Sequence, residues 1–122
     1  MLKKSKEKTD KVYLPTESEM LGFKPMRSDY EWKKNTEGLI EIKIPKFNGN
    51  FGKSFCKFIK KDNHFTAKMD RIGSTIWINA DGNKTVKEIF EILKKEYPDE
   101  KNINQRLYLF LQQMKALNYI NF

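Results

Sequence analysis

Three amphipathic stripes in residues 69–122 constrain the fold of this chain more than any other feature. Apolar residues recur there every three to four positions, which is the spacing of one face of an α-helix. The stripes comprise Met69, Ile72, Gly73, Ile76 and Trp77, then Val86, Ile89, Phe90 and Leu93, then Ile103, Leu107, Phe110, Leu111, Met114 and Leu117. We predict three helices of about three to four turns each.

Turn and cap signals separate the stripes. Asp81-Gly82-Asn83 ends the first, and Tyr97-Pro98-Asp99 ends the second. Thr85 and Glu88 have the spacing of a capping box, in which each side chain bonds the backbone amide of the other residue. Gly73 permits a close approach to the first helix, and Gly82 permits a turn of positive φ. After the third stripe, we expect Tyr119, Ile120 and Phe122 to pack back on the core.

The segment before the helices carries strand signals. Ile40, Ile42 and Ile44 alternate with Glu41 and Lys43, which predicts a strand with one buried face that ends at Pro45. Tyr30 and Trp32 indicate a preceding strand, and the turn formers of residues 35–38 indicate a hairpin between the two. A third short strand is expected over His64–Lys68, with Phe65 and Ala67 on one side, after a turn at Asp62-Asn63.

Two further segments have weaker patterns. Phe51, Phe55, Phe58 and Ile59 have helix-like spacing and predict a short helix over residues 53–60. Residues 1–25 read as a flexible basic N-terminal tail, with a short ordered lead-in at Met20, Leu21 and Phe23. The expected organisation is therefore a tail over residues 1–25 and one domain over residues 26–122.

This order of elements defines the expected fold class. A small N-terminal antiparallel sheet followed by a three-helix bundle makes an α+β domain, and its outline is winged-helix-like. With 39% hydrophobic residues, the chain has enough apolar side chains for one core.

The residues capable of catalysis or metal binding are few. His64 is the single histidine and Cys56 the single cysteine, so a zinc site of about four such ligands is excluded. Gly52-Lys53-Ser54 lacks the first glycine of a phosphate-binding loop, since Phe47 occupies that position. A dyad of His64 and Cys56 lacks a third orienting group in the pattern. We expect a binding domain without a cofactor, not an enzyme.

The charge of +8 lies mainly in two segments. Residues 1–11 carry a net +3 and residues 53–71 a net +4, whereas residues 82–101 are neutral. No apolar run approaches the ~20 residues of a membrane-spanning helix. With one cysteine and no secretory signal pattern, the chain is expected in the cytoplasm, as a monomer or homodimer.

One run of residues is more specific than a generic helical pattern. Lys68-Met69-Asp70-Arg71-Ile72-Gly73-Ser74-Thr75-Ile76-Trp77, followed by Asp81-Gly82-Asn83-Lys84-Thr85-Val86-Lys87-Glu88-Ile89, resembles the PqqD family of pyrroloquinoline quinone biosynthesis. Gln105-Arg106-Leu107 and Phe110-Leu111-Gln112-Gln113-Met114 are similar to the last helix of that family. The likeness covers residues 64–122 best. The N-terminal extension and the 46–62 connection depart from the compact quinone-pathway protein.

The resemblance implies a function and a site. Such domains are recognition elements for ribosomally made precursor peptides, and they present the peptide to a modifying enzyme such as a radical SAM protein. The peptide leader adds as a strand to a sheet edge, in a cleft against the last helix. Carried over to this chain, that edge is the third strand, and the implied peptide-binding residues are His64, Phe65, Thr66, Ala67, Lys68, Arg71, Arg106, Tyr108, Leu109 and Gln113.

Two other functions stay open on the sequence. A winged helix with a charge of +8 is compatible with nucleic-acid binding, but the third stripe carries only Arg106 and Lys115 as basic residues, fewer than phosphate contacts and base readout usually need. An accessory subunit or scaffold of an enzyme complex, with the helices as a docking face, is the second alternative.

Overall fold

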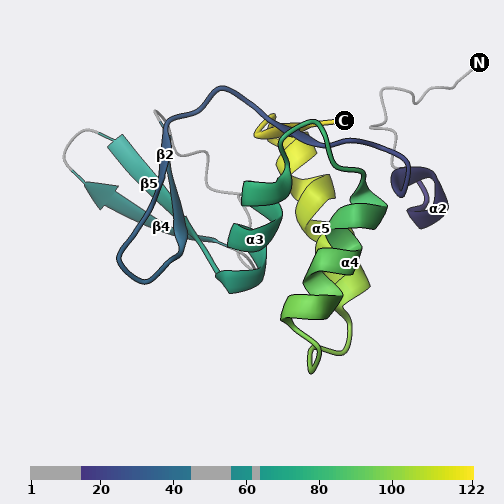
Figure 1. Cartoon of the computed structure of the whole chain (residues 1–122). Coiled ribbons are helices and arrows are strands. Elements are labelled where there is room, and N and C mark those ends of the chain that lie inside the picture. The colour runs from purple at the N-terminus through teal and green to yellow at the C-terminus, as the bar shows by residue number, and fades with distance from the viewer. Residues whose placement is uncertain (1–14, 45–55, 62–63) are drawn as a thin grey trace, which may run out of the picture.

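The computed structural model describes residues 15–44, 56–61 and 64–122, and for residues 44, 56–61, 64 and 65 it describes the backbone alone. The elements follow in the order α2 (Glu17–Met20), β1 (Met26–Arg27), β2 (Trp32–Lys34), β3 (Ile40–Ile44), β4 (Cys56–Lys61), β5 (His64–Met69), α3 (Arg71–Asn79), α4 (Val86–Glu96), α5 (Ile103–Ala116) and β6 (Ile120–Asn121) (Figure 1).

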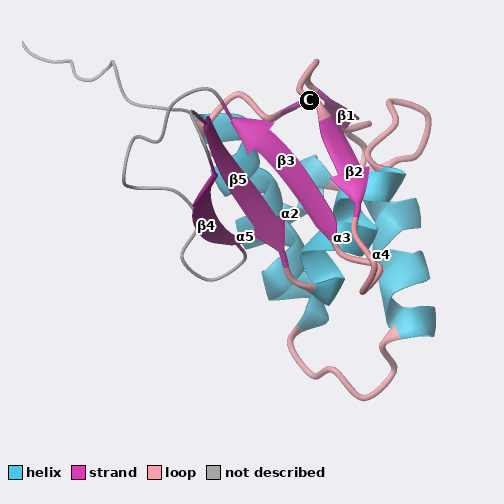
Figure 2. Ribbon diagram, turned by 90° about the vertical axis from the view of Figure 1, so that its left-hand side faces the viewer, coloured by secondary structure: helices cyan, strands magenta, loops and turns pink. Residues whose placement is uncertain are grey.

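The fold is an α+β domain, as predicted. Four antiparallel strands form a sheet in the order β2-β3-β5-β4, and the helices lie on one face of it (Figure 2). The two short strands β1 and β6 form a separate antiparallel pair. The winged-helix outline stays a prediction.

The predicted hairpin is present. Trp32 pairs with Ile42 and Lys34 with Ile40, so the buried isoleucines of β3 set the register. In the loop, the Asn35 side chain accepts hydrogen bonds from the amides of Glu37 and Leu39, 2.9 Å each. Gly38 adopts a φ of +83°, which side chains other than glycine rarely tolerate.

Each of the first two helices after the sheet, α3 and α4, begins at a residue whose side chain caps it. Asp70 accepts a hydrogen bond from the Gly73 amide and starts α3. The Thr85–Glu88 capping box is present at the start of α4. The predicted close approach at Gly73 is also confirmed, because a Cβ there would lie 3.0 Å from the ring of Phe110.

The core lies between β3, β5 and the three long helices. Ile40 and Ile42 of the sheet are fully buried against the helical stripes. Its largest fully buried side chains are Trp77, Phe110, Met20, Ile40, Ile42, Met69, Ile76, Ile89, Leu93, Leu107 and Leu111. The C-terminal residues pack back as expected, with Tyr119 and Ile120 in the core and Phe122 against it.

The helix predicted over residues 53–60 is wrong for the part that the structure describes. Residues Cys56–Lys61 form strand β4, which pairs with β5 along its whole length. The i, i+3, i+4 spacing of aromatic residues suggested a helix, but pairing with a strand close in sequence satisfies the same backbone groups. Residues 53–55, Pro45 and the predicted turn at Asp62-Asn63 lie outside the described residues.

Residues 16–25 join the fold at the start of α4. A capping box of Thr16 and Glu19 starts α2, and Met20 in that helix is fully buried. The carbonyls of Leu21 and Phe23 accept hydrogen bonds from the first two amides of α4, 3.1 and 2.9 Å long. These amides have no partner inside their own helix. The lead-in is therefore part of the packed structure, while the domain boundary at residue 25 stays a prediction and residues 1–14 lie outside the described range.

The turn between α3 and α4 yields a stability prediction. Gly82 has a φ of +83°, where an added Cβ is strained, whereas a Cβ at Gly22 meets no atom within 4 Å. We expect Gly82→Ala to lower the free energy of unfolding by about 1–2 kcal/mol. Gly22→Ala, the matched control, should change it by less than about 0.5 kcal/mol. Urea unfolding measures both, and equal effects would contradict the assigned turn.

None of the described helices is long and apolar enough to cross a membrane.

Candidate functional site

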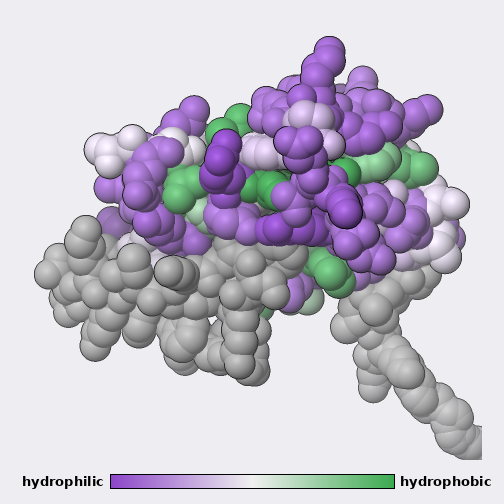
Figure 3. Space-filling view, turned by 90° about the horizontal axis from the view of Figure 1, so that it is seen from below, coloured by the Kyte–Doolittle hydropathy of each residue, from purple (hydrophilic) through white to green (hydrophobic). Residues whose placement is uncertain are grey.

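The exposed side of α5 carries the candidate site. We call it the α5 surface and define it by six residues: Gln105, Arg106, Tyr108, Leu109, Gln112 and Gln113. Leu109 is 53% exposed, which is unusual for a leucine within an otherwise packed helix. Seen from below the view of Figure 1, the described residues form a mostly hydrophilic surface with a broken row of hydrophobic residues (Figure 3). Leu109 therefore offers an exposed apolar side chain on α5.

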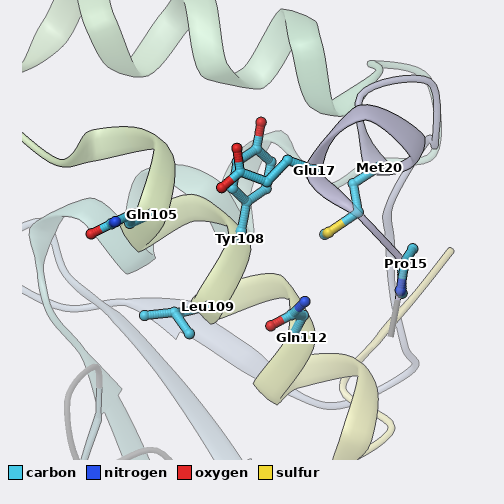
Figure 4. A pocket seen from close by; sticks show the side chains of 7 residues that line it. All are labelled: Pro15, Glu17, Met20, Gln105, Tyr108, Leu109 and Gln112. Carbon is cyan, nitrogen blue, oxygen red and sulfur yellow. The ribbon is translucent and has the colours of Figure 1, made fainter. Parts of the chain in front are cut away.

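A pocket of about 380 Å³ opens between α5 and helix α2. It is lined by Pro15, Glu17, Met20, Gln105, Tyr108, Leu109 and Gln112 (Figure 4). Glu17 of α2 points toward Tyr108, and the two glutamines lie along α5 on either side of Leu109. The lining therefore combines an apolar floor with amide groups that can both donate and accept.

Tyr108 supplies the phenol of this pocket. Its side chain is 8% exposed, and burial together with the nearby Glu17 carboxylate raises its pKa above the usual 10. The phenol thus stays protonated at neutral pH and can donate a hydrogen bond.

Arg106 is held on the opposite flank of α5. Its Nη2 donates to Asp70 Oδ2 at 2.5 Å, and its Nη1 lies 3.7 Å from Glu100 Oε2. The same Asp70 caps α3 through its other oxygen. This arrangement fixes α5 against the junction of β5 and α3, so Arg106 contributes positioning as well as charge.

Gln113 presents an acceptor without a donor. Its Oε1 atom is buried, yet no group in the described part of the chain donates to it. A buried acceptor without a partner costs about 1–3 kcal/mol. Gln113 is therefore the residue of the α5 surface with an unused hydrogen-bond acceptor among the described residues.

The predicted strand residues do not form a free edge. β5 lies inside the sheet, with Ala67 opposite Ile42 of β3 on one side and opposite Phe58 of β4 on the other. The expectation that the third strand is the edge is therefore wrong, because the residues expected to form a helix pair with it instead. His64 and Phe65 open β5, where they pair with Lys61 and Lys60.

The remaining candidate residues lie in different surroundings. Thr66 is half-buried in β5, and Ala67 is fully buried. Lys68 forms an ion pair with Glu37 of the hairpin loop at 3.0 Å. Arg71 is stacked over Tyr97 at the end of α4, 5.8 Å from the ring centroid. The structure thus brings Arg106, Tyr108, Leu109 and Gln113 together on one helix and leaves Arg71 elsewhere.

The N-terminal wall of the pocket was missed from the sequence. Pro15, Glu17 and Met20 line it, together with Gln105 and Gln112 of α5. The signal was present, because Thr16 and Glu19 have the same capping-box spacing that identified the start of α4.

A second exposed apolar group lies on a different part of the surface. Met26 is 57% exposed and Trp32 is 37% exposed, with the Arg27 guanidinium 5.1 Å from the centre of the Trp32 ring. Both line a pocket of about 370 Å³ beside β1. This group supplies matched controls for the α5 surface.

The described residues contain no group of three or more His, Cys, Asp or Glu side chains placed to hold a metal ion.

The double role of Asp70 leads to a prediction. Asp70→Ala removes both the cap and the ion pair and should cost about 1–2 kcal/mol of the free energy of unfolding. Asp70→Asn keeps the cap and should cost less than about 1 kcal/mol, as should Arg106→Ala, because the pair is about one-third exposed. Chemical unfolding of the three variants checks this order, and an Asp70→Asn loss equal to that of Asp70→Ala would contradict the capping role.

A small α+β domain with a pocket and an exposed leucine on helix α5 defines the class. Residues 62–120 match the model of coenzyme PQQ synthesis protein D (PqqD), and this region of the chain belongs to the PqqD family. Members of the family are non-catalytic accessory proteins of PQQ biosynthesis. No curated protein and no solved structure is significantly similar to the chain.

Proposed function

We propose that this chain is a non-catalytic cytoplasmic accessory protein that binds a ribosomally made precursor peptide and presents it to a modifying enzyme, such as a radical SAM protein. The observation that carries the proposal is the α5 surface within the matched region. There, the exposed Leu109 lies one helical turn from the unpaired acceptor of Gln113.

The chemistry of that surface suits a polypeptide. A peptide backbone offers N–H donors at regular intervals, which an acceptor such as Gln113 Oε1 requires. Leu109 offers an apolar contact, and the amides of Gln105 and Gln112 recognise backbone groups of either polarity. Side chains of this kind give specificity when main-chain bonds to a sheet give affinity.

Nucleic-acid binding receives less support from the same helix. Both basic residues of α5 are engaged within the chain: Arg106 with Asp70 and Glu100, and Lys115 with the Phe122 carbonyl at 2.8 Å. Phosphate binding depends on several cations that are available to release counterions. We therefore favour a peptide ligand.

Affinity capture tests the proposal. The tagged chain is incubated with native lysate, and bound material is identified by mass spectrometry for proteins and short peptides. We expect a short precursor peptide, which Leu109→Ala should recover in smaller amount than the wild-type chain. Recovery of nucleic acid alone, lost at high salt, would overturn the proposal, and recovery of a partner protein without any peptide would favour a scaffold.

A further inference from the structure

One charged side chain of the pocket between α5 and α2 has no role in the proposed function. Glu17 is the only charged residue among the described residues that line this pocket, and it is exposed at the start of α2. Its side chain points toward Tyr108 of α5 (Figure 4). After burial, the Glu17 carboxylate is the second cause that raises the pKa of the Tyr108 phenol. The negative charge of Glu17 therefore acts on the opposite wall of the pocket.

The wall that carries Glu17 is held in place by the fold. The capping box of Thr16 and Glu19 starts α2 on either side of Glu17. Met20, at the end of the same helix, is fully buried in the core. These residues precede the region, residues 62–120, that matches the family model. The family match therefore assigns no ligand to this wall.

The lining suits a long side chain with a positively charged end. Met20 and Leu109 offer apolar contacts, which the methylene stem of a lysine or an arginine can cover. Glu17 offers a carboxylate for the charged group, and the amide oxygens of Gln105 and Gln112 can accept its remaining N–H bonds. An arginine fits best, because its planar guanidinium has five donors that match carboxylate and amide oxygens. An acidic side chain would instead meet the like charge of Glu17.

No cation of the described lining competes for Glu17. The seven lining residues include no lysine, arginine or histidine. The two basic residues of α5 lie outside the lining, and both bond to other groups of the chain: Arg106 to Asp70, and Lys115 to the Phe122 carbonyl. An incoming basic side chain would supply the positive charge that the described pocket lacks.

We infer that the pocket between α5 and α2 binds a basic side chain of the peptide, and that Glu17 is the residue that selects it. This inference rests on the proposed function and adds the class of residue that the peptide presents at one position. Because Glu17 is exposed to solvent, water and salt screen its attraction. The charge pair therefore contributes a modest preference over a neutral side chain, while apolar contacts supply the remaining affinity.

Three short synthetic peptides test the inference without a captured precursor. Each has the form acetyl-Leu-X-Leu-amide, where X is arginine, its neutral isostere citrulline, or glutamate. They are titrated into the isotope-labelled full chain, and NMR follows the side chains of Gln105, Leu109 and Gln112. The arginine peptide should give saturable shifts and bind about two- to fivefold more tightly than the citrulline peptide. The glutamate peptide should bind most weakly, and added salt should reduce these differences.

Variants of Glu17 give the sharper result. Glu17→Gln should abolish the preference for arginine over citrulline, and Glu17→Lys should make the glutamate peptide the tightest of the three. Glu96→Gln is the matched control, because it removes the same charge from an exposed position on α4 outside the pocket, and it should keep the wild-type preference. The amide NMR spectrum establishes that each variant is folded.

Three outcomes would overturn the inference: no saturable shifts at the pocket with any peptide, equal binding of the arginine and citrulline peptides, or a preference for arginine that persists in Glu17→Gln. A natural precursor captured through Leu109 would leave the proposed function standing in each of these cases. Conversely, an arginine preference without a captured precursor would support the selectivity of the pocket while the proposed function failed.

Discussion

Replacing Met20 by alanine should lower the free energy of unfolding by about 2–5 kcal/mol, the usual cost of a fully buried methionine. Met20 is completely inaccessible and belongs to the core, although it lies in the segment that the sequence assigned to the tail. The residues just after it accept hydrogen bonds from the start of α4. Loss of Met20 should therefore loosen the pocket wall as well as the core.

Met26→Ala is the matched control for that substitution. The side chain has the same chemistry but is 57% exposed, so its loss should change the free energy of unfolding by less than about 0.5 kcal/mol. Urea unfolding of both variants measures the difference. A Met20→Ala variant as stable as Met26→Ala would show that residues 16–25 do not pack on the domain in solution.

The second large effect is expected on peptide binding. Leu109→Ala should weaken binding of the captured precursor peptide roughly tenfold, because burying a leucine side chain contributes about 1.5–3 kcal/mol and Leu109 is already half-buried. Because Leu109 is largely exposed, its replacement by alanine should change the free energy of unfolding little. Isothermal titration calorimetry gives the dissociation constant.

Two exposed apolar residues outside the α5 surface serve as controls for Leu109. Met26→Ala and Ile78→Ala remove comparably exposed apolar groups, 57% and 37%, and should leave peptide affinity unchanged. If those two variants weaken binding while Leu109→Ala does not, the peptide binds beside β1 and the α5 surface is not the site.

The long periodic elements could be predicted from sequence because local and tertiary requirements agree there. The stripes that contain Ile76, Ile89 and Leu111 are each one buried face of a helix, and the Thr85–Glu88 box marks a helix start with residues only three apart. The alternation of Ile40 and Ile42 likewise reflects a sheet with one buried face. Gly82 could be interpreted because a turn of positive φ admits few residues.

The errors share a physical cause: in each, the structure of a weakly patterned segment depends on its contacts with another element. The six residues of β4 have mixed spacing, and their strand form depends on β5, which sequence periodicity does not reveal. Because residues 53–60 were predicted as a helix, β5 was expected at the edge of the sheet, whereas it is an interior strand. The burial of Met20 similarly depends on a contact with helices that follow far along the chain.

Four of the six residues that define the α5 surface were predicted from the sequence. Tyr108 and Leu109 were assigned to the binding surface by resemblance, and both line the pocket. Their partners across the pocket, Glu17 and Met20, come from an element of four residues whose position only the tertiary structure gives. For Arg106, the sequence indicates charge but not the contact with Asp70 that positions it.

The central claim, that this chain binds a precursor peptide, is tested most directly by titrating the synthetic form of the captured peptide into the purified chain in a calorimeter. The account predicts saturable binding of one peptide per chain, weakened by Leu109→Ala, unchanged by Met26→Ala and retained at high salt. Absence of saturable heat with a folded chain, or binding that disappears with salt and is unaffected by Leu109→Ala, would contradict it.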